Sequence, residues 1–363
     1  MYSIVVKSTQ KLSQFIKPAA YRPSRGLASK LIFSEYGEPV KVVQKTSEDE
    51  NVLQPDKNEI LVKMLAAPVN PVDINVIEGT YPARPRLPAV PGYEGVGIVE
   101  KVGPEVVEIQ EGDHVIPIHG FLGTWRTHLV MASDKVRKVP QELGLAEAAT
   151  LTINPCTAYR MLKDFSNLNA GDYIIQNGAN SSCGQIIIQL CKLWGINSIN
   201  IVRNRPDLPE VKNYLTELGA TYVFSEEELL QNAIQKNDIQ KPILGLNCVG
   251  GRMALEIAKY LEDGSVLITY GGMSKEPVYI PTSALIFKDI EVRGFWMTRW
   301  FNENDDSVEK EDMFEELITM IGNKDLQGSL YEMVKFDDYT KALEHTMSSK
   351  GMEGKKFILD FTS

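Results

Sequence analysis

One segment, Asp172–Arg205, constrains the fold of this chain more than any other. Its sequence, DYIIQNGANSSCGQIIIQLCKLWGINSINIVRNR, is typical of a strand, a glycine-containing turn, a helix and a second strand. Units of this kind build parallel sheets with helices on both faces. The same unit holds a dinucleotide when its turn directs backbone N–H groups at a pyrophosphate. The segment therefore predicts an α/β nucleotide-binding domain.

The turn of this unit, Asn177–Gly184, is poorer in glycine than the usual GxGxxG motif. Between its two glycines lie Asn180, Ser181 and Ser182. Asparagine tolerates left-handed backbone geometry, and serine can cap a helix while offering a hydroxyl. An ordinary capped helix is the alternative, but the position at the carboxyl end of a strand favours a ligand.

Two arginines stand where an NAD-binding fold usually carries an acid. Arg203 and Arg205 end the second predicted strand, with Asn204 between them. An acid at this place, roughly 20 residues after the turn, would hold the ribose 2′-hydroxyl. A guanidinium instead donates to phosphate oxygens, which a carboxylate would repel. The pair predicts NADPH as the cofactor; a solvated surface pair is the alternative.

The pattern of predicted strands and helices changes near residue 153. Before it, short strands punctuated by Gly and Pro predict a partly open β-barrel or sandwich; after it, apolar strands alternate with helical patterns, which predicts a doubly wound parallel sheet. The last predicted strand can return to the first domain. The expected strands are Glu59–Val69, Glu94–Gly103, Asp113–Ile118, Trp125–Met131, Asp172–Asn177, Ser198–Val202, Thr221–Ser225, Pro242–Gly250, Ser265–Gly272, Asp289–Trp296 and Lys356–Phe361.

The first 30 residues differ from the rest. They are rich in Ser, Lys and Arg, and no acid occurs before Glu35. This composition is typical of an organelle transit peptide and predicts delivery to the mitochondrial matrix, with a basic tail that carries no address as the alternative. We therefore expect a transit peptide at 1–29, a catalytic domain at 30–153 and 300–363, and a nucleotide-binding domain at 154–299.

Composition excludes several classes of protein. A net charge of −10 argues against a general nucleic-acid binder, which would show a basic face. No apolar run approaches the roughly 18 residues of a membrane span. The four cysteines form no CxxC pair and no zinc-finger cluster, so we expect buried, reduced thiols.

The first domain resembles the catalytic domain of the medium-chain dehydrogenase/reductase superfamily. The segments that carry the resemblance are AAPVNPVDIN, PAVPGYEGVGIVEKVG and EGDHVIP. Superfamily alcohol dehydrogenases hold a catalytic zinc with Cys and His. Here the VNPVD segment has no cysteine, and Tyr93 stands in place of the histidine. Zinc needs such ligands, so we expect a zinc-free enzyme with no bound metal.

Further segments resemble the mitochondrial enoyl-acyl-carrier-protein reductases, also called trans-2-enoyl-CoA reductases. In order along about residues 31–361 they are FLGTWRTHLV, INPCTAYRML, GDYIIQNGANSSCGQ, VRNRPDL, LNCVGG, TYGGM and LIFKDIEVRGFW. The resemblance implies a GroES-like barrel domain and a Rossmann-type domain. It also implies NADPH-dependent reduction of trans-2-enoyl thioesters, on acyl carrier protein or CoA, for mitochondrial fatty acid synthesis. A homodimer formed through the nucleotide-domain sheet is a further expectation from the family.

Specific roles follow from the same resemblance. Tyr81, in EGTYPARP, takes the place of the catalytic tyrosine, which donates a proton or stabilises an enolate. One departure is that Ser182 and Cys183 occupy positions where relatives tend to have Gly and Val. The nucleotide contacts carry over onto Asn154, Asn180, Ser181, Ser182, Cys183, Arg203, Asn204, Arg205, Tyr270, Gly271, Gly272, Met273, Phe295, Trp296, Met297, Thr298 and Lys356.

Two other functions are open at this point. An NADPH quinone oxidoreductase of the same zinc-free fold can share NPVD and the GTY near Tyr81, although GTWRTH, NPCTAYRML and RGFW favour the enoyl reductase. A non-enzymatic binding protein that kept the fold would show a damaged nucleotide site, which the arginine pair argues against.

Overall fold

The computed structural model describes residues 27–118, 120–348 and 355–363. Most of the transit peptide expected at 1–29 therefore lies outside the described residues. Its last three residues, from Leu27 to Ser29, already belong to strand β1 (Leu27–Phe33). This strand pairs antiparallel with β2 (Val43–Asp49) along its whole length, from Leu27 opposite Asp49 to Phe33 opposite Val43. Strand β1 thus spans the boundary expected at residue 30, and that boundary stays a prediction.

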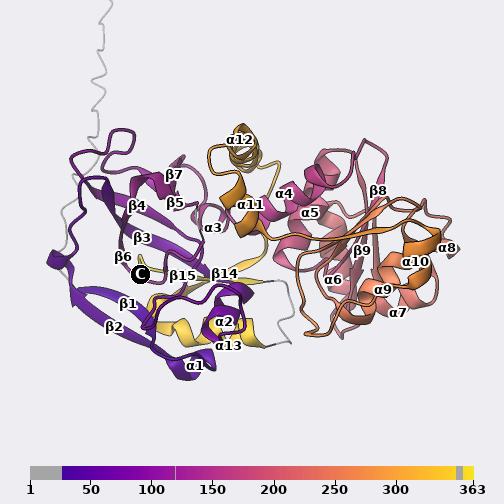
Figure 1. Ribbon diagram of the computed structural model, residues 1–363, viewed down its shortest axis with the longest axis horizontal. Coiled ribbons are helices and arrows are strands. Elements are labelled where there is room, and N and C mark those ends of the chain that lie inside the picture. Colours follow the sequence, from indigo (N-terminus) through magenta and orange to yellow (C-terminus); the bar gives the residue numbers. More distant parts are fainter. Residues whose placement is uncertain (1–26, 119, 349–354) are drawn as a thin grey trace, which may run out of the picture.

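The described chain forms two lobes, each built around one large sheet, and the first lobe also carries the two-stranded sheet of β1 and β2 (Figure 1). The first lobe holds a seven-stranded sheet of order β14-β15-β3-β4-β5-β7, with β6 also paired to β3. Its strands are β3 (Glu59–Val69), β4 (Val96–Val102), β5 (His114–Pro117), β6 (His128–Ala132), β7 (Val136–Val139), β14 (Tyr331–Lys335) and β15 (Lys356–Asp360).

The last strand of the chain completes the first lobe. β15 lies between β14 and β3, parallel to the former and antiparallel to the latter, with Phe357 opposite Val69. The polypeptide therefore leaves the first lobe, builds the second and returns, as the sequence predicted. The yellow end of the chain lies beside indigo strands in Figure 1. The exact boundaries proposed near residues 153 and 299 stay predictions.

The second lobe is a doubly wound parallel sheet of order β10-β9-β8-β11-β12-β13. The order reverses direction at β8, where the first unit of the sheet begins, and such a switch point is where this fold binds ligands. Its strands are β8 (Tyr173–Asn177), β9 (Asn197–Val202), β10 (Tyr222–Ser225), β11 (Leu244–Asn247), β12 (Val266–Thr269) and β13 (Glu291–Gly294).

Helices cover both sheets and the space between them (Figure 1). The first lobe carries α1 (Pro39–Val42), η1 (Glu50–Val52), α2 (Pro71–Ile77), η2 (Ser133–Lys135), α3 (Leu145–Ala149), η3 (Phe336–Asp338) and α13 (Tyr339–Met347). The second carries α4 (Asn154–Asp164), α5 (Ser182–Leu193), α6 (Leu208–Leu218), α7 (Glu226–Leu230), α8 (Ala233–Lys236), α9 (Gly251–Tyr260) and α10 (Thr282–Phe287). Between the lobes lie α11 (Met297–Glu303) and α12 (Val308–Gly322).

One hydrophobic core is shared by the two lobes. It joins Ile116 and Val139 of the first lobe to Ile174 and Ile186 of the second, with Phe314 of α12 in the same cluster. A second cluster lies inside the first lobe around the fully buried Trp125, whose indole N–H donates to the Pro68 carbonyl at 3.1 Å. The shared core fixes one lobe against the other, so residues that face each other across the junction hold defined positions.

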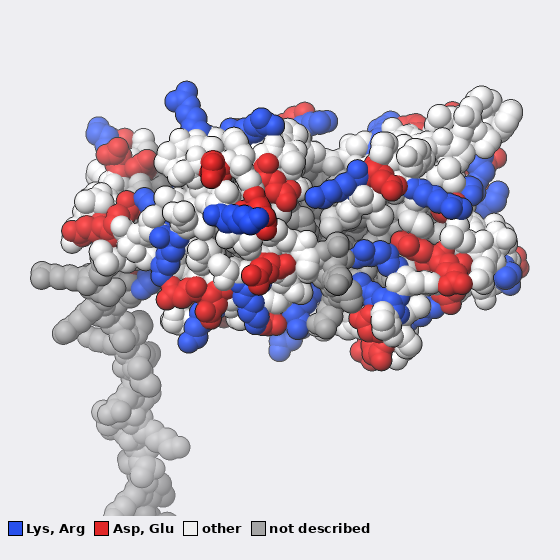
Figure 2. All heavy atoms as spheres, turned by 90° about the horizontal axis from the view of Figure 1, so that it is seen from below, with Lys and Arg blue, Asp and Glu red and all other residues white. Residues whose placement is uncertain are grey.

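The surface carries both signs of charge. On the face in Figure 2, Lys and Arg are interspersed with Asp and Glu, without a continuous basic area. This pattern agrees with the negative net charge of the sequence. Among the described residues, no helix has the length and apolar character needed to cross a membrane.

Candidate active site and cofactor cradle

The predicted turn joins β8 to α5 as expected. Gly178 takes a positive φ of 61°, and Ser181 caps α5 by accepting a hydrogen bond from the Gly184 N–H at 3.2 Å. A Cβ at Gly184 would lie 2.5 Å from the Ala179 carbonyl oxygen, so only glycine lets the helix start this close to the strand. The first-turn N–H groups of α5 therefore point out of the carboxyl end of the sheet, where an anion binds favourably.

Two asparagines that the sequence analysis did not single out tie the strand ends together. Asn177, at the end of β8, donates to Asn247 Oδ1 at 2.8 Å and accepts the N–H groups of Cys248 and Val249 at 2.7 and 3.1 Å. Asn247, at the end of β11, donates to Thr269 Oγ1 at 3.0 Å. Three neighbouring strand ends are thus cross-linked by buried amides, which keeps the ligand-facing edge rigid.

The arginine pair follows β9, at the tip of the same edge. Arg203 is exposed, whereas the Arg205 side chain is 6% exposed and lies 3.7 Å from the Asp207 carboxylate. Asp207 is the N-cap residue of α6. Asn204 donates to Glu227 of α7 at 2.6 Å. Of the two arginines, Arg203 is the exposed one.

Residues after β12 approach the turn from the other side. Tyr270 lies close to Cys183 and Cys248, and burial raises the pKa of its hydroxyl far above the usual value. Gly271 sits so close to Cys248 that a Cβ would lie 2.8 Å from its carbonyl oxygen. Gly272 and Met273 are exposed. The four cysteines, Cys156, Cys183, Cys191 and Cys248, are free and buried, as expected.

The Tyr81 side chain of the first lobe contacts the segment that follows β13. Its ring lies 6.0 Å, centroid to centroid, from that of Trp296 and 6.2 Å from that of Tyr93, both in edge-on arrangement. Phe295 and Thr298 of the same segment are half-buried, and Met297 is buried. Burial raises the pKa of Tyr81, and the neighbouring Trp296 side chain works in the opposite direction. Tyr81 therefore stays protonated at neutral pH and can donate.

Beneath Tyr81 lies a buried polar network drawn from the NPVD and GYEG motifs. Asn70 donates to Glu94 Oε1 at 3.0 Å, and its backbone N–H donates to Asp73 Oδ2 at 2.8 Å. Lys356 of β15 donates to Asn70 Oδ1 and lies 4.0 Å from Glu94 Oε1. The second oxygen of Glu94 accepts from the Thr152 hydroxyl and the Ile153 N–H. The floor of the site is thus assembled from both ends of the first lobe.

The protonation of this floor is unusual. Burial raises the pKa of Asp73 from 3.8 to about 8, against the hydrogen bond from the Asn70 N–H. Burial also raises the pKa of Glu94, and the Lys356 ammonium opposes that rise. The network consequently holds one carboxylic acid, Asp73, that is largely protonated at neutral pH. Burial lowers the pKa of Lys356, and the nearby Glu94 and Asp73 oppose that change.

A superfamily catalytic zinc does not fit this floor. Its place is surrounded by Asn70, Asp73, Tyr93 and Glu94, which supply neither a thiolate nor an imidazole. The Lys356 ammonium already balances the carboxylate there. A dinucleotide fits better, since the capped turn and the exposed arginine offer the groups that its phosphates require.

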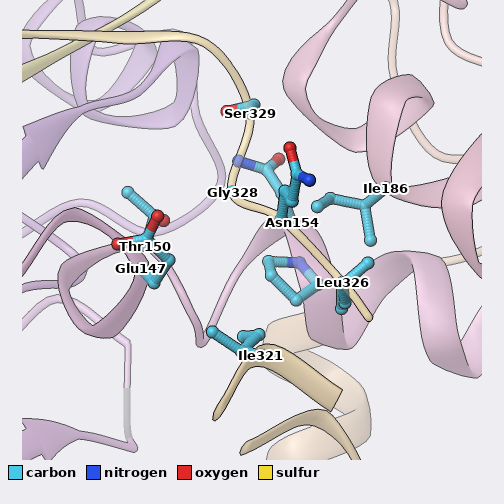
Figure 3. Close-up of a pocket in the computed structure, with 10 residues that line it drawn as sticks. Glu147, Thr150, Asn154, Ile186, Ile321, Leu326, Gly328 and Ser329 are labelled. Atoms are coloured by element: carbon cyan, nitrogen blue, oxygen red, sulfur yellow. The ribbon is translucent and has the colours of Figure 1, made fainter. Parts of the chain in front are cut away.

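Two predicted contact residues lie apart from the strand edge. Lys356 is 6% exposed and is committed to the floor network, so a contact of its ammonium with a cofactor stays a prediction. Asn154, at the start of α4, lines a small pocket with Ile186 and Ser329 (Figure 3). The Asn154 carbonyl accepts from the Cys183 thiol at 3.8 Å, which links this pocket to the nucleotide turn.

The other predicted residues divide between two adjoining areas. Asn180–Cys183, Arg203–Arg205 and Tyr270–Met273 lie at the carboxyl edge of the second sheet, where the parallel strands end. Trp296 faces Tyr81 across the junction of the lobes. Their roles in binding the cofactor are predictions.

The chain matches known families and proteins along most of its length. Residues 56–141 match the alcohol dehydrogenase GroES-like domain, and residues 183–320 match the zinc-binding dehydrogenase family. It is 42% identical to the mitochondrial enoyl-acyl-carrier-protein reductase of Xenopus tropicalis over 90% of this chain and 95% of that protein. Identity to the human protein of the same name is 42%, over 91% of this chain and 87% of the relative.

Solved structures agree. A complex of Etr1p with NADP and crotonyl-CoA superposes with a TM-score of 0.83 at 34% identity, covering 92% of this chain and 100% of that one. The mitochondrial 2-enoyl thioester reductase Etr1p/Etr2p heterodimer from Candida tropicalis gives the same values. A NADPH:quinone reductase from Bacillus thuringiensis is similar at a TM-score of 0.81 and 28% identity, covering 92% and 99%. With 42% identity to named reductases over 90% of its length, the chain belongs to the mitochondrial enoyl-acyl-carrier-protein reductase family.

Proposed function

We propose that this protein reduces the 2,3 double bond of trans-2-enoyl thioesters with NADPH, in the fatty acid synthesis of the mitochondrial matrix. The observation that carries the proposal is the position of Tyr81. It is a protonated phenol of the first lobe, held against Trp296 of the segment that follows the nucleotide-binding strands. The relatives named above and the complex with NADP and crotonyl-CoA support the same reaction.

The chemistry requires one hydride and one proton. NADPH, when bound, supplies the hydride for the β-carbon of the thioester. Negative charge then spreads over the α-carbon and the thioester oxygen, and Tyr81 either donates its proton to the α-carbon or holds the oxygen by a hydrogen bond. The raised pKa keeps the phenol in the donating form. Trp296 and Tyr93 hold the ring by edge-on contacts on two sides.

The direct test is Tyr81→Phe, which removes only the hydroxyl. We expect turnover of crotonyl-CoA to fall by about 10²–10⁴-fold, the usual contribution of a positioned acid, while NADPH affinity stays within twofold. Tyr339→Phe, which removes a hydroxyl donated to the Val43 carbonyl in the first lobe, is the matched control. Near-normal turnover of the Tyr81 variant would refute the role in proton transfer.

Reduction of quinones is the second candidate, favoured by the fold similarity to a quinone reductase. Both activities use the same cofactor, so the acceptor decides between them. We expect crotonyl-CoA to oxidise NADPH far faster than a soluble benzoquinone at equal concentration. The reverse order would favour quinone reduction, and failure to bind NADPH at all would favour a non-enzymatic protein.

The acceptor in the cell and the assembly are also proposals. We infer that acyl carrier protein presents the thioester, as the names of the relatives suggest. We infer further that two copies pair through the edge of the second sheet. All four residues of the edge strand β13 are exposed, and beside it Ile286 and Phe287 are 65% and 79% exposed. A bare edge strand flanked by apolar side chains is suited to pairing with a second copy.

A further inference from the structure

A cluster of three potential metal ligands lies within the first lobe. Glu50 of η1, Glu100 of β4 and His128 of β6 each place one ligand atom within 4.8 Å of the others. His128 Nε2 lies 3.4 Å from Glu100 Oε2 and 3.8 Å from Glu50 Oε1. The side chains of His128 and Glu100 are both 6% exposed, and that of Glu50 is 14% exposed. Solvent is therefore largely excluded from the space between them.

The hydrogen bonds of His128 determine which ring nitrogen carries the proton. Thr127 Oγ1 accepts from the Ser29 N–H at 2.9 Å and donates its single proton to the Ser29 carbonyl at 3.3 Å. With the hydroxyl proton on the Ser29 carbonyl, the contact of 3.0 Å between Thr127 Oγ1 and His128 Nδ1 uses a proton of the ring. In the neutral imidazole this leaves Nε2 unprotonated, with its lone pair free to act as a ligand.

That lone pair has no hydrogen-bond partner. Nε2 is a buried atom that makes no hydrogen bond within the described residues, although two carboxylate oxygens face it. An imidazole lone pair and carboxylate oxygens are all acceptors, and a shared cation satisfies them together. A cation held between them would give the Nε2 lone pair a partner.

The distances suit a small divalent ion. Zinc binds imidazole nitrogen and carboxylate oxygen at 2.0–2.2 Å, so neighbouring ligands of a tetrahedral site lie about 3.3–3.6 Å apart. The Nε2 to Glu100 separation of 3.4 Å lies within this range, and the Nε2 to Glu50 separation of 3.8 Å is slightly longer. Three ligands leave a fourth position for water. The Nδ1 contact to Thr127 is the outer hydrogen bond that metal-bound histidines usually make.

The backbone brings Glu100 to this place by an irregularity in the sheet. Along β3, Leu61 pairs with Lys101 and Val62 with Val99, so Glu100 is the extra residue of a bulge in β4. Bulges re-aim a side chain relative to regular alternation. His128 comes from β6, on the opposite side of β3, where it pairs with Lys63. Glu50 arrives from the short helix η1 that follows the β1–β2 hairpin.

From these observations we propose that Glu50, Glu100 and His128 bind one divalent transition-metal ion of the zinc type. The ion has a structural role, because it ties η1, and with it the β1–β2 hairpin, to the two strands that flank β3. It is distinct from the floor beneath Tyr81, which offers no thiolate or imidazole.

The test uses the full-length protein after treatment with a chelator and removal of the chelator. Zn²⁺ is titrated in competition with a chromogenic indicator. We expect one equivalent to bind, and we expect His128→Asn and Glu100→Gln each to weaken it at least tenfold. The matched control is His114→Asn, a change at a half-buried histidine of β5. This variant should still bind one equivalent of Zn²⁺. Crotonyl-CoA turnover of all three variants should match that of the parent, which also shows that they fold.

Co²⁺ identifies the ligands. We expect visible bands of low-coordinate Co²⁺ without the near-ultraviolet band of a thiolate, and their loss in His128→Asn. Zn²⁺ should also raise the thermal unfolding midpoint of the parent but not of that variant. Absence of a stoichiometric ion from the parent, equal binding by the variants, or a thiolate band would each overturn the proposal.

Discussion

At the residue scale, we expect cofactor choice to depend on Arg203. This side chain is exposed at the tip of β9, whereas Arg205 is turned toward Asp207. Hydrogen bonds to a charged group contribute about 1.5–3 kcal/mol, so we expect Arg203→Ala to weaken NADPH binding roughly 10–100-fold and to leave NADH binding unchanged. A fluorescence titration of both nucleotides measures this. Arg252→Ala, on the exposed face of α9, is the control. If the affinities for NADPH and NADH fall equally, Arg203 does not bind the 2′-phosphate.

The buried carboxyl group of Asp73 should make the stability of the protein depend on pH. Its folded-state pKa of about 8 lies above the unfolded value near 3.8, so the native state binds more protons between these limits. Stability must then fall as pH rises from 4 to 8, by at most about 1.4 kcal/mol per pH unit for one proton. Asp73→Asn imitates the protonated acid and removes this contribution. We expect urea unfolding of the variant to depend less steeply on pH across that window; parallel curves would contradict the assignment.

Single residues were predictable where a motif or a family position marked them. Tyr81 and the arginine pair carry such marks, and the structure places Tyr81 against Trp296. Asn177 and Asn247 carry none, because each follows an apolar strand as any turn residue does. Their cross-link appears only when β8 and β11 become neighbours in the sheet. Lys356 was predicted as a cofactor contact, but its network with Asn70 depends on the return of β15.

At the element scale, the cap of α5 has a role beyond stability. Ser181 and Ser307 both cap helices, α5 and α12, by accepting an N–H of the first turn. Replacing either by alanine should cost about 1 kcal/mol of unfolding free energy. Only Ser181→Ala should also weaken NADPH binding, since α5 begins at the proposed pyrophosphate site. Denaturant unfolding and nucleotide titration of the two variants test this. A loss of affinity in Ser307→Ala of the same size would contradict it.

At this scale, strands were predictable from sequence where they contain a long run of apolar residues. β3 has the bounds expected for it, because its run of apolar residues is long and buried. β2 was not predicted, since its sequence VQKTSED is polar and mostly exposed. β13 is shorter than expected and exposed on all four residues, because it forms the sheet edge.

At the scale of the whole molecule, that edge makes assembly testable. In a two-fold pair through β13, Val292 of one copy would lie near its counterpart, and Val292→Glu would set like charges against each other. We expect the parent to sediment as a dimer and this variant as a monomer. Val308→Glu, at an exposed position at the start of α12, should remain dimeric. A monomeric parent, or a dimeric Val292 variant, would refute pairing through this edge.

The return of the chain to its first sheet also orders events during biosynthesis. The carboxyl half of β3 lacks its partner β15 until every strand of the nucleotide-binding sheet has left the ribosome. Until then Glu94 and Asn70 have no Lys356 beside them. The second lobe can therefore fold during translation, while the floor beneath Tyr81 closes only with the last strand. A chain released early would carry a nucleotide-binding lobe without a finished reaction site, and so would not reduce substrate.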